Sequence, residues 1–136
     1  SVQKFLEHFL PQREESADDY EVPQYADEPQ TTYERASEVM DHCAANVDEG
    51  YGLYWHAIGK SKTEHAMVLY LQDGHVIYGL STDAADEPYV RQLLTSMKAF
   101  LDSCCGYIAH EASPDAATLE EFEALTKTAG TLNKGE

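Results

Sequence analysis

The stretch that decides the fold lies between Gly52 and Ser81 and reads GLYWHAI (52–58), GKSKTEH (59–65), AMVLYL (66–71), QDG (72–74) and HVIYGLS (75–81). The first, third and fifth runs are rich in aromatic and β-branched residues, and short polar turns separate them. Asp73-Gly74 is typical of a tight two-residue hairpin turn, because glycine adopts positive φ without a steric penalty. The stretch therefore predicts three antiparallel strands that form a meander.

Apolar residues at helical spacing flank the meander on both sides. Helices are predicted at Val2–Leu10, at Thr32–Val47, from Glu87-Pro88 to Cys104 and around Leu119–Leu125. Thr31 or Thr32 caps the second of them, and Tyr107–Glu111 predicts a fourth strand. The expected fold class is α+β with the element order α-α-β-β-β-α-β-α, in which the helices pack mainly on one face of the antiparallel sheet.

The segment before the second helix has a different composition. Residues 12–31 contain Pro23, Pro29 and seven acids, with a few apolar anchors such as Tyr20 and Tyr25. This pattern predicts an extended arm that wraps the domain or waits for a partner. We expect residues 1–31 to form a short helix and this acidic arm, and residues 32–136 to form a single α+β domain.

Charge limits the classes of partner. The 136 residues include 25 Asp and Glu against nine Lys and Arg, a net charge of −16. Such a surface repels phosphates and anionic lipid headgroups, so we expect neither nucleic acid nor membrane binding, whereas the same field speeds encounter with a basic protein. The alternative is that acidity only maintains solubility or adapts the protein to high salt. No leading segment has the pattern of an export signal, so the expected compartment is the cytoplasm.

Register assigns each strand residue to a face of the sheet. We expect Gln72 to pair with His75, and Gly59 with His65. One face is then almost wholly apolar and forms the core: Leu53, Trp55, Ala57, Met67, Leu69, Leu71, Val76, Tyr78 and Leu80. The other face is a mixture of polar and apolar groups: Tyr54, His56, Ile58, Ala66, Val68, Tyr70, Ile77, Gly79 and Ser81.

The mixed face is the predicted binding surface. Tyr and His each offer apolar area and a polar tip, as interfaces do, and Gly79 lets another backbone or ring approach closely. The predicted binding residues are Tyr54, His56, Tyr70, Gly79 and Ser81, with the nearby acids Asp48, Glu49 and Glu64. The arm, a second copy of the chain or a different protein are the candidates to cover this face.

The chain lacks the sequence motifs of nucleotide, dinucleotide, α/β-hydrolase and zinc-protease sites. Its Cys residues are three in number and show no metal-ligand spacing, and His65 and His75 are expected at opposite ends of the sheet. We therefore predict no metal, no cofactor and no catalytic residues. Cys43 lies on an apolar helix stripe, so its thiol is expected to be buried and unreactive.

These observations predict a non-enzymatic acidic module that binds a basic protein. In size, acidity and element order the chain resembles small acidic binding proteins such as toxin immunity proteins and secretion chaperones, a likeness of fold that carries no function by itself. The alternative is a small-molecule-binding protein or enzyme that uses a pocket lined by Tyr and His, with His56 as proton carrier. A homodimer that buries the mixed face is compatible with either.

Overall fold

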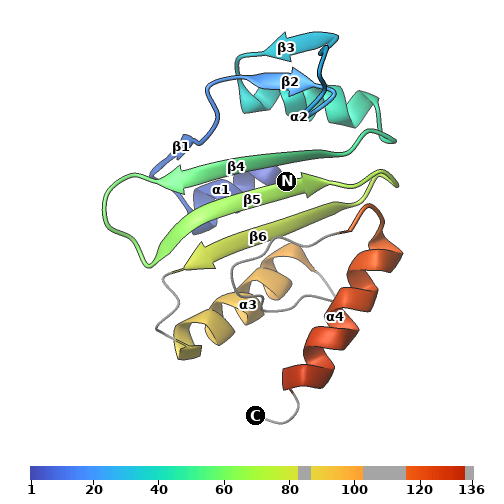
Figure 1. The fold of residues 1–136 in the computed structure, drawn as a ribbon. Coiled ribbons are helices and arrows are strands. Elements are labelled where there is room, and N and C mark those ends of the chain that lie inside the picture. Colours follow the sequence, from blue (N-terminus) through green and yellow to red (C-terminus); the bar gives the residue numbers. More distant parts are fainter. Residues whose placement is uncertain (83–86, 103–115, 134–136) are drawn as a thin grey trace. The chain divides into compact units, whose positions relative to one another are not determined.

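The computed structural model describes residues 1–82, 87–102 and 116–133, with side chains up to Lys127. The chain divides into two compact units, Ser1–Ser81 and Thr82–Glu136, and each is described by itself (Figure 1). The described residues hold four helices and six strands, so the predicted α+β class with antiparallel strands is confirmed.

The first unit contains a four-stranded sheet in the order β1-β4-β5-β6 and a separate two-stranded hairpin, β2-β3. Its elements are α1 (Val2–Phe9), β1 (Arg13–Glu15), β2 (Tyr20–Val22), β3 (Thr31–Tyr33), α2 (Ala36–Ala45), β4 (Tyr51–Ala57), β5 (Thr63–Tyr70) and β6 (Val76–Thr82). The predicted meander is β4-β5-β6. Residues of the predicted arm add β1 to the edge of β4 and form β2.

The second helix begins four residues later than predicted. Thr31 and Thr32 belong to β3 and do not cap it; the N-cap is Arg35, whose backbone N–H donates to the Glu38 side chain. The carboxylate of Glu15, far away in sequence, also accepts the N–H of Ala36 at 2.8 Å. A carboxylate at this position suits the exposed N–H groups and the dipole of the helix start.

The register between the strands differs from the predicted one. His65 lies opposite His56 rather than Gly59, and Trp55 lies opposite Ala66. In the next hairpin Gly74 N–H donates to the Leu71 carbonyl and Leu71 N–H to the His75 carbonyl. This is a three-residue loop with Gly74 at φ +86°, one residue longer than the predicted turn.

Relative to the prediction, β5 is shifted by three residues against β4 and by one residue against β6. Because both shifts are odd, the two faces of β5 are exchanged, whereas the residues of β4 and β6 still share the faces predicted for them. The core face therefore carries Ala66, Val68 and Tyr70 from β5, and the predicted placement of Met67, Leu69 and Leu71 there was wrong. Phe5 of α1, fully buried, packs its ring against Tyr78 at 4.8 Å on this same face.

Both helices of the first unit lie on the core face of the sheet. Leu6 of α1, Met40 of α2 and Trp55 of β4 line one cavity of about 540 Å³. Trp55, Leu53 and Val68 are buried beneath the helices. The expectation that helices gather on one sheet face holds within this unit.

The second unit contains α3 (Glu87–Leu101) and α4 (Leu119–Asn133). Both begin where predicted, but α4 extends beyond the predicted Leu119–Leu125. Cys104 and the predicted strand Tyr107–Glu111 lie outside the described residues. Among the helices that the structure describes, none has the length and apolar character needed to cross a membrane.

Candidate functional site

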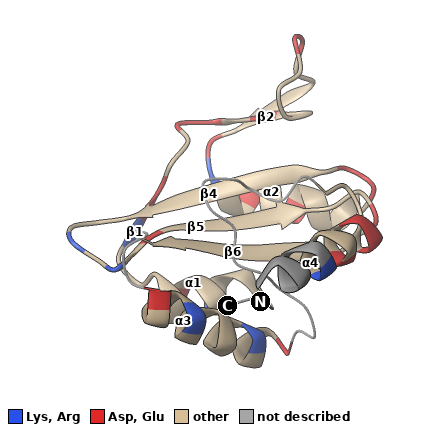
Figure 2. Ribbon diagram, turned by 60° about the horizontal axis from the view of Figure 1, so that its bottom comes forward, with Lys and Arg blue, Asp and Glu red and all other residues tan. Residues whose placement is uncertain are grey.

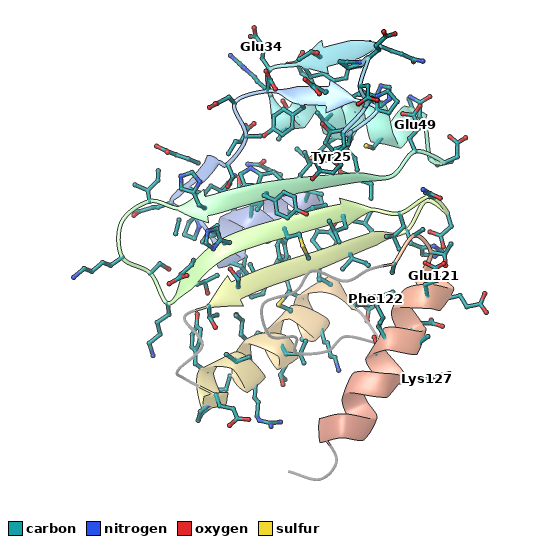
Figure 3. All side chains as sticks on the ribbon, viewed as in Figure 1. Tyr25, Glu34, Glu49, Glu121, Phe122 and Lys127 are labelled. Atoms are coloured by element: carbon teal, nitrogen blue, oxygen red, sulfur yellow. The ribbon has the colours of Figure 1, made fainter. Side chains whose placement is uncertain are left out.

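A cavity of about 350 Å³ opens where the β2-β3 hairpin meets the edge of β4. It is lined by Ser16, Ala17, Asp19, Tyr20, Glu21, Gln24, Tyr25, Tyr51, Gly52 and Tyr54. We call it the tyrosine cavity, after its four tyrosines. Figure 3 shows Tyr25 between the hairpin and β4.

Gln24 fastens the hairpin to the sheet. Its side-chain N–H donates to the Gly52 carbonyl at 3.0 Å, and its side-chain oxygen accepts the Gly52 N–H at 2.8 Å. The side-chain amide of Gln24 thus pairs with the backbone of β4 as a residue of a neighbouring strand would. It does so directly after the last backbone hydrogen bond on this edge of β4, which Ser16 N–H donates to the Tyr54 carbonyl. An edge strand presents unpaired backbone groups, and here a side chain satisfies them.

Two of the four tyrosines are buried and hold fixed hydroxyl groups. Tyr51, 7% exposed, donates to the Glu21 carbonyl at 2.8 Å, and Tyr20 donates to the Glu15 carboxylate at 2.6 Å. Burial raises the pKa of Tyr51 to about 12, and electrostatic interaction with the ionised forms of Cys43, Tyr25, Glu21 and Asp19 adds to the effect. The phenol is therefore neutral at physiological pH.

The other two tyrosines form the exposed part of the cavity wall. Tyr54 is 38% exposed, and Tyr25 is 85% exposed. Tyr25 also has φ +64°, a left-handed conformation that is costly for a bulky residue. The hairpin thus holds a large apolar ring in water on a strained backbone, at the mouth of a concave site.

The cavity lies within the most acidic part of the chain. Residues 14–49, which we call the acidic segment, contain twelve Asp and Glu and one Arg, a net charge of −11. All twelve acids are exposed. Figure 2 shows acidic positions along the connection from β1 to β2 and in the loop beyond β2, and the remaining acids lie before, within and after α2. The cavity therefore sits in a strongly negative potential.

The predicted residues His56 and Ser81 lie elsewhere, in a polar row across the sheet. Glu14 of β1 faces His56 of β4, which faces His65 of β5, and His65 contacts Ser81 of β6. The Glu14 Oε2–His56 Nε2 distance is 3.3 Å, and His65 Nδ1–Ser81 Oγ is 3.0 Å. Sequence analysis missed His65 because the predicted register placed it opposite Gly59.

His56 and His65 are close neighbours by the geometry of the ladder. Ser16 donates to the Tyr54 carbonyl and Ile58 donates to the Gln12 carbonyl, so the intervening His56 also directs its backbone groups toward β1. His56 and His65 are thus a non-hydrogen-bonded pair, the arrangement in which opposing side chains lie closer. Ser16 Oγ lies 3.1 Å from His56 Nδ1.

Tyr70 and Gly79 do not join His56. Tyr70 lies on the core face opposite Tyr51, and burial raises its pKa to about 12. Gly79 does lie on the mixed face, but an added Cβ there would come within 2.5 Å of Met67 Cε. The space above Gly79 is therefore filled by a methionine side chain of the neighbouring strand.

Two of the predicted acids are simply exposed, and the third has a partner. Asp48 lies in the loop before β4, and Glu64 lies at the start of β5. Glu49 accepts a hydrogen bond from His42 Nε2, and His42 Nδ1 lies 3.1 Å from the Tyr33 hydroxyl. Glu49 thus ties the end of α2 to the loop that leads into β4.

Cys43 behaves as the sequence predicts. The thiol is buried, and burial raises its pKa to about 11.

Across the part of the chain that the structure describes, no three His, Cys, Asp or Glu side chains are grouped so as to hold a metal ion. Comparison with protein-family models, with curated proteins and with solved structures gave no match.

Proposed function

We propose that the protein is a non-enzymatic acidic module that binds a basic protein through the acidic segment. The observation that carries the proposal is the concentration of charge: twelve exposed acids and one Arg within residues 14–49. One Arg cannot neutralise twelve carboxylates, so this surface presents an uncompensated negative field. Such a field raises the rate of encounter with a positively charged partner and repels anionic ones.

The surface proposed for binding overlaps only in part with the one that the sequence indicated. Of the predicted residues, Asp48 and Glu49 belong to the acidic segment and Tyr54 lies in the tyrosine cavity, whereas Tyr70 lies on the core face of the sheet and His56 lies in the polar row. The proposed binding surface therefore lies on the hairpin and the edge of β4 and not on the mixed face of the sheet. The enzyme alternative is weaker on this geometry, because the concave site is lined by tyrosines and carboxylates and His56 is not part of its wall.

The test is the affinity for a fluorescently labelled basic peptide of about 20 residues, rich in Lys and Arg, measured by anisotropy at rising NaCl. Asp27→Asn, Glu28→Gln and Glu34→Gln, which we call the hairpin variant, neutralise two exposed acids between β2 and β3 and one directly after β3, none of which lines the cavity. The matched control neutralises three exposed acids outside the acidic segment: Glu7→Gln, Glu87→Gln and Glu120→Gln.

Both triple variants have the same net charge, so they separate position from total charge. We expect the hairpin variant to lose about tenfold in affinity at low salt, and the control to stay within about twofold. The affinity of the wild type should fall steeply with salt, because the Debye length shrinks to about 10 Å at 0.1 M. Equal losses in the two variants would mean non-specific attraction and would contradict the proposal.

A further inference from the structure

We propose that the tyrosine cavity receives a cationic side chain, Lys or Arg, of the basic partner. The inference rests on the proposed function and names the site at which the partner is anchored. The cation would lie against the rings of Tyr25 and Tyr54, with the carboxylates of Asp19 and Glu21 beside it.

The lining has the chemistry that recognises organic cations. The face of an aromatic ring carries negative potential, and cages of several rings bind ammonium and guanidinium groups. Here the residues that line the cavity beside the rings include Asp19 and Glu21, so two negative charges belong to its wall. An anion or a neutral apolar group would gain nothing from this field.

The size of the cavity suits one side chain. About 350 Å³ is near the lower limit of ligand pockets, which span roughly 300–1,000 Å³. The cavity is open to solvent on the side of Tyr25, so the long apolar stem of Lys or Arg could lie along the exposed ring while its head reaches the carboxylates. Entry of the side chain would cover the apolar surface that Tyr25 exposes.

The backbone of Tyr25 provides an independent argument. Glycine adopts φ +64° without strain, whereas a tyrosine at that position costs stability. The residue is 85% exposed, so its ring gains little from packing within the chain. Residues held in strained conformations gather at binding sites, where the geometry serves function rather than stability.

The experiment uses the basic peptide described above with Tyr25→Gly and Tyr54→Ala. The control, Phe100→Ala, removes an exposed ring from the second unit. Urea unfolding followed by the fluorescence of Trp55 checks the fold of the two tyrosine variants, and circular dichroism checks the helices of the control. We expect a loss of about three- to tenfold in peptide affinity for each tyrosine variant and a change under twofold for the control. Because glycine relieves the strained backbone, the urea midpoint of Tyr25→Gly should be no lower than that of the wild type.

The outcomes distinguish this inference from the proposed function. If the three acids of the hairpin variant matter and the two tyrosines do not, the cavity is not the anchor, although the acidic segment still binds. If neither set matters, both proposals fail. A lower urea midpoint for Tyr25→Gly would make the ring structural and would overturn the inference.

A second arm identifies the source of the cation. Tetramethylammonium chloride is titrated while the ring signals of Tyr25 and Tyr54 are followed by NMR, with NaCl at equal ionic strength as control. We expect weak binding of the free cation and competition with the peptide. Saturable tetramethylammonium binding that leaves peptide affinity unchanged would assign the cavity to a small free cation instead of a side chain, and would overturn the inference.

Discussion

Replacement of Gln24 by Ala should weaken the attachment of the hairpin to the sheet. The side chain makes two hydrogen bonds to the backbone of Gly52, at 3.0 and 2.8 Å. Each contributes about 0.5–1.5 kcal/mol net, and water can replace part of the loss at a half-buried edge. We therefore expect Gln24→Ala to lower the free energy of unfolding by about 1–2 kcal/mol.

A matched variant tests the reasoning more closely. Gln24→Glu keeps an oxygen that accepts the Gly52 N–H but directs a second oxygen at the Gly52 carbonyl, so it should be no more stable than Gln24→Ala. Urea unfolding monitored at Trp55, the single tryptophan and a buried residue of β4, reports on the first unit. With an m-value of about 2 kcal/mol per M, the midpoint should fall by about 0.5–1 M.

A local measurement separates this effect from a general loss of packing. Hydrogen exchange at the Gly52 amide should accelerate in Gln24→Ala, while the Val68 amide at the centre of the sheet should change only by the amount that global stability requires. The account would be refuted by a Gln24→Ala variant with unchanged stability and unchanged exchange at Gly52. It would also be refuted by a Gln24→Glu variant as stable as wild type.

Three further predictions concern stability. Burial raises the pKa of Tyr51 to about 12, so above pH 10 the unfolded chain releases a proton that the folded chain retains. The stability that this phenol contributes should be fully present below pH 10 and should be lost as the pH rises toward 12, so urea unfolding at each pH should show a shallower decline in Tyr51→Phe than in the wild type. Glu15→Gln removes the charge that faces the Ala36 N–H at the start of α2, and should lower the free energy of unfolding by about 1 kcal/mol; an unchanged midpoint would speak against this capping role. Gly74→Ala forces a Cβ into φ +86° and should cost about 1 kcal/mol, which a stability equal to wild type would contradict.

The long elements could be predicted from sequence because their patterns repeat. The three meander strands and the helix at Glu87 extend over enough residues for alternation or helical spacing to emerge from the background. The strands β1, β2 and β3 have three residues each, too few for a period to be visible. Tertiary pairing creates them, since β1 exists only as a neighbour of β4.

The faces of the sheet could be predicted only in part. Asp73-Gly74 correctly marked a hairpin and a positive φ, but the same dipeptide suits both the two-residue turn and the three-residue loop with a bulge. The Asp73 side chain accepts the His75 N–H at 3.2 Å, a contact that accompanies the longer loop. The register differs from the predicted one by three residues against β4 and by one against β6, and these shifts reversed β5, so Tyr70 was assigned to the mixed face although it lies on the core face.

The tyrosine cavity could not have been predicted from local patterns. Tyr20 and Tyr25 stood out as anchors of an acidic arm, yet the position where the arm docks depends on Gln24 and Gly52, which are 28 residues apart. Neither residue has a distinctive sequence signature. The exposed and strained ring of Tyr25 becomes informative only once its backbone conformation is known.

The most direct test of the central claim is a map of hydrogen exchange with and without the basic peptide bound. The account predicts slower exchange in residues 16–25 and 50–54, where the hairpin and β4 enclose the cavity, and no change in α3 or α4. Protection confined to α3 and α4, or binding without protection of the hairpin, would contradict it.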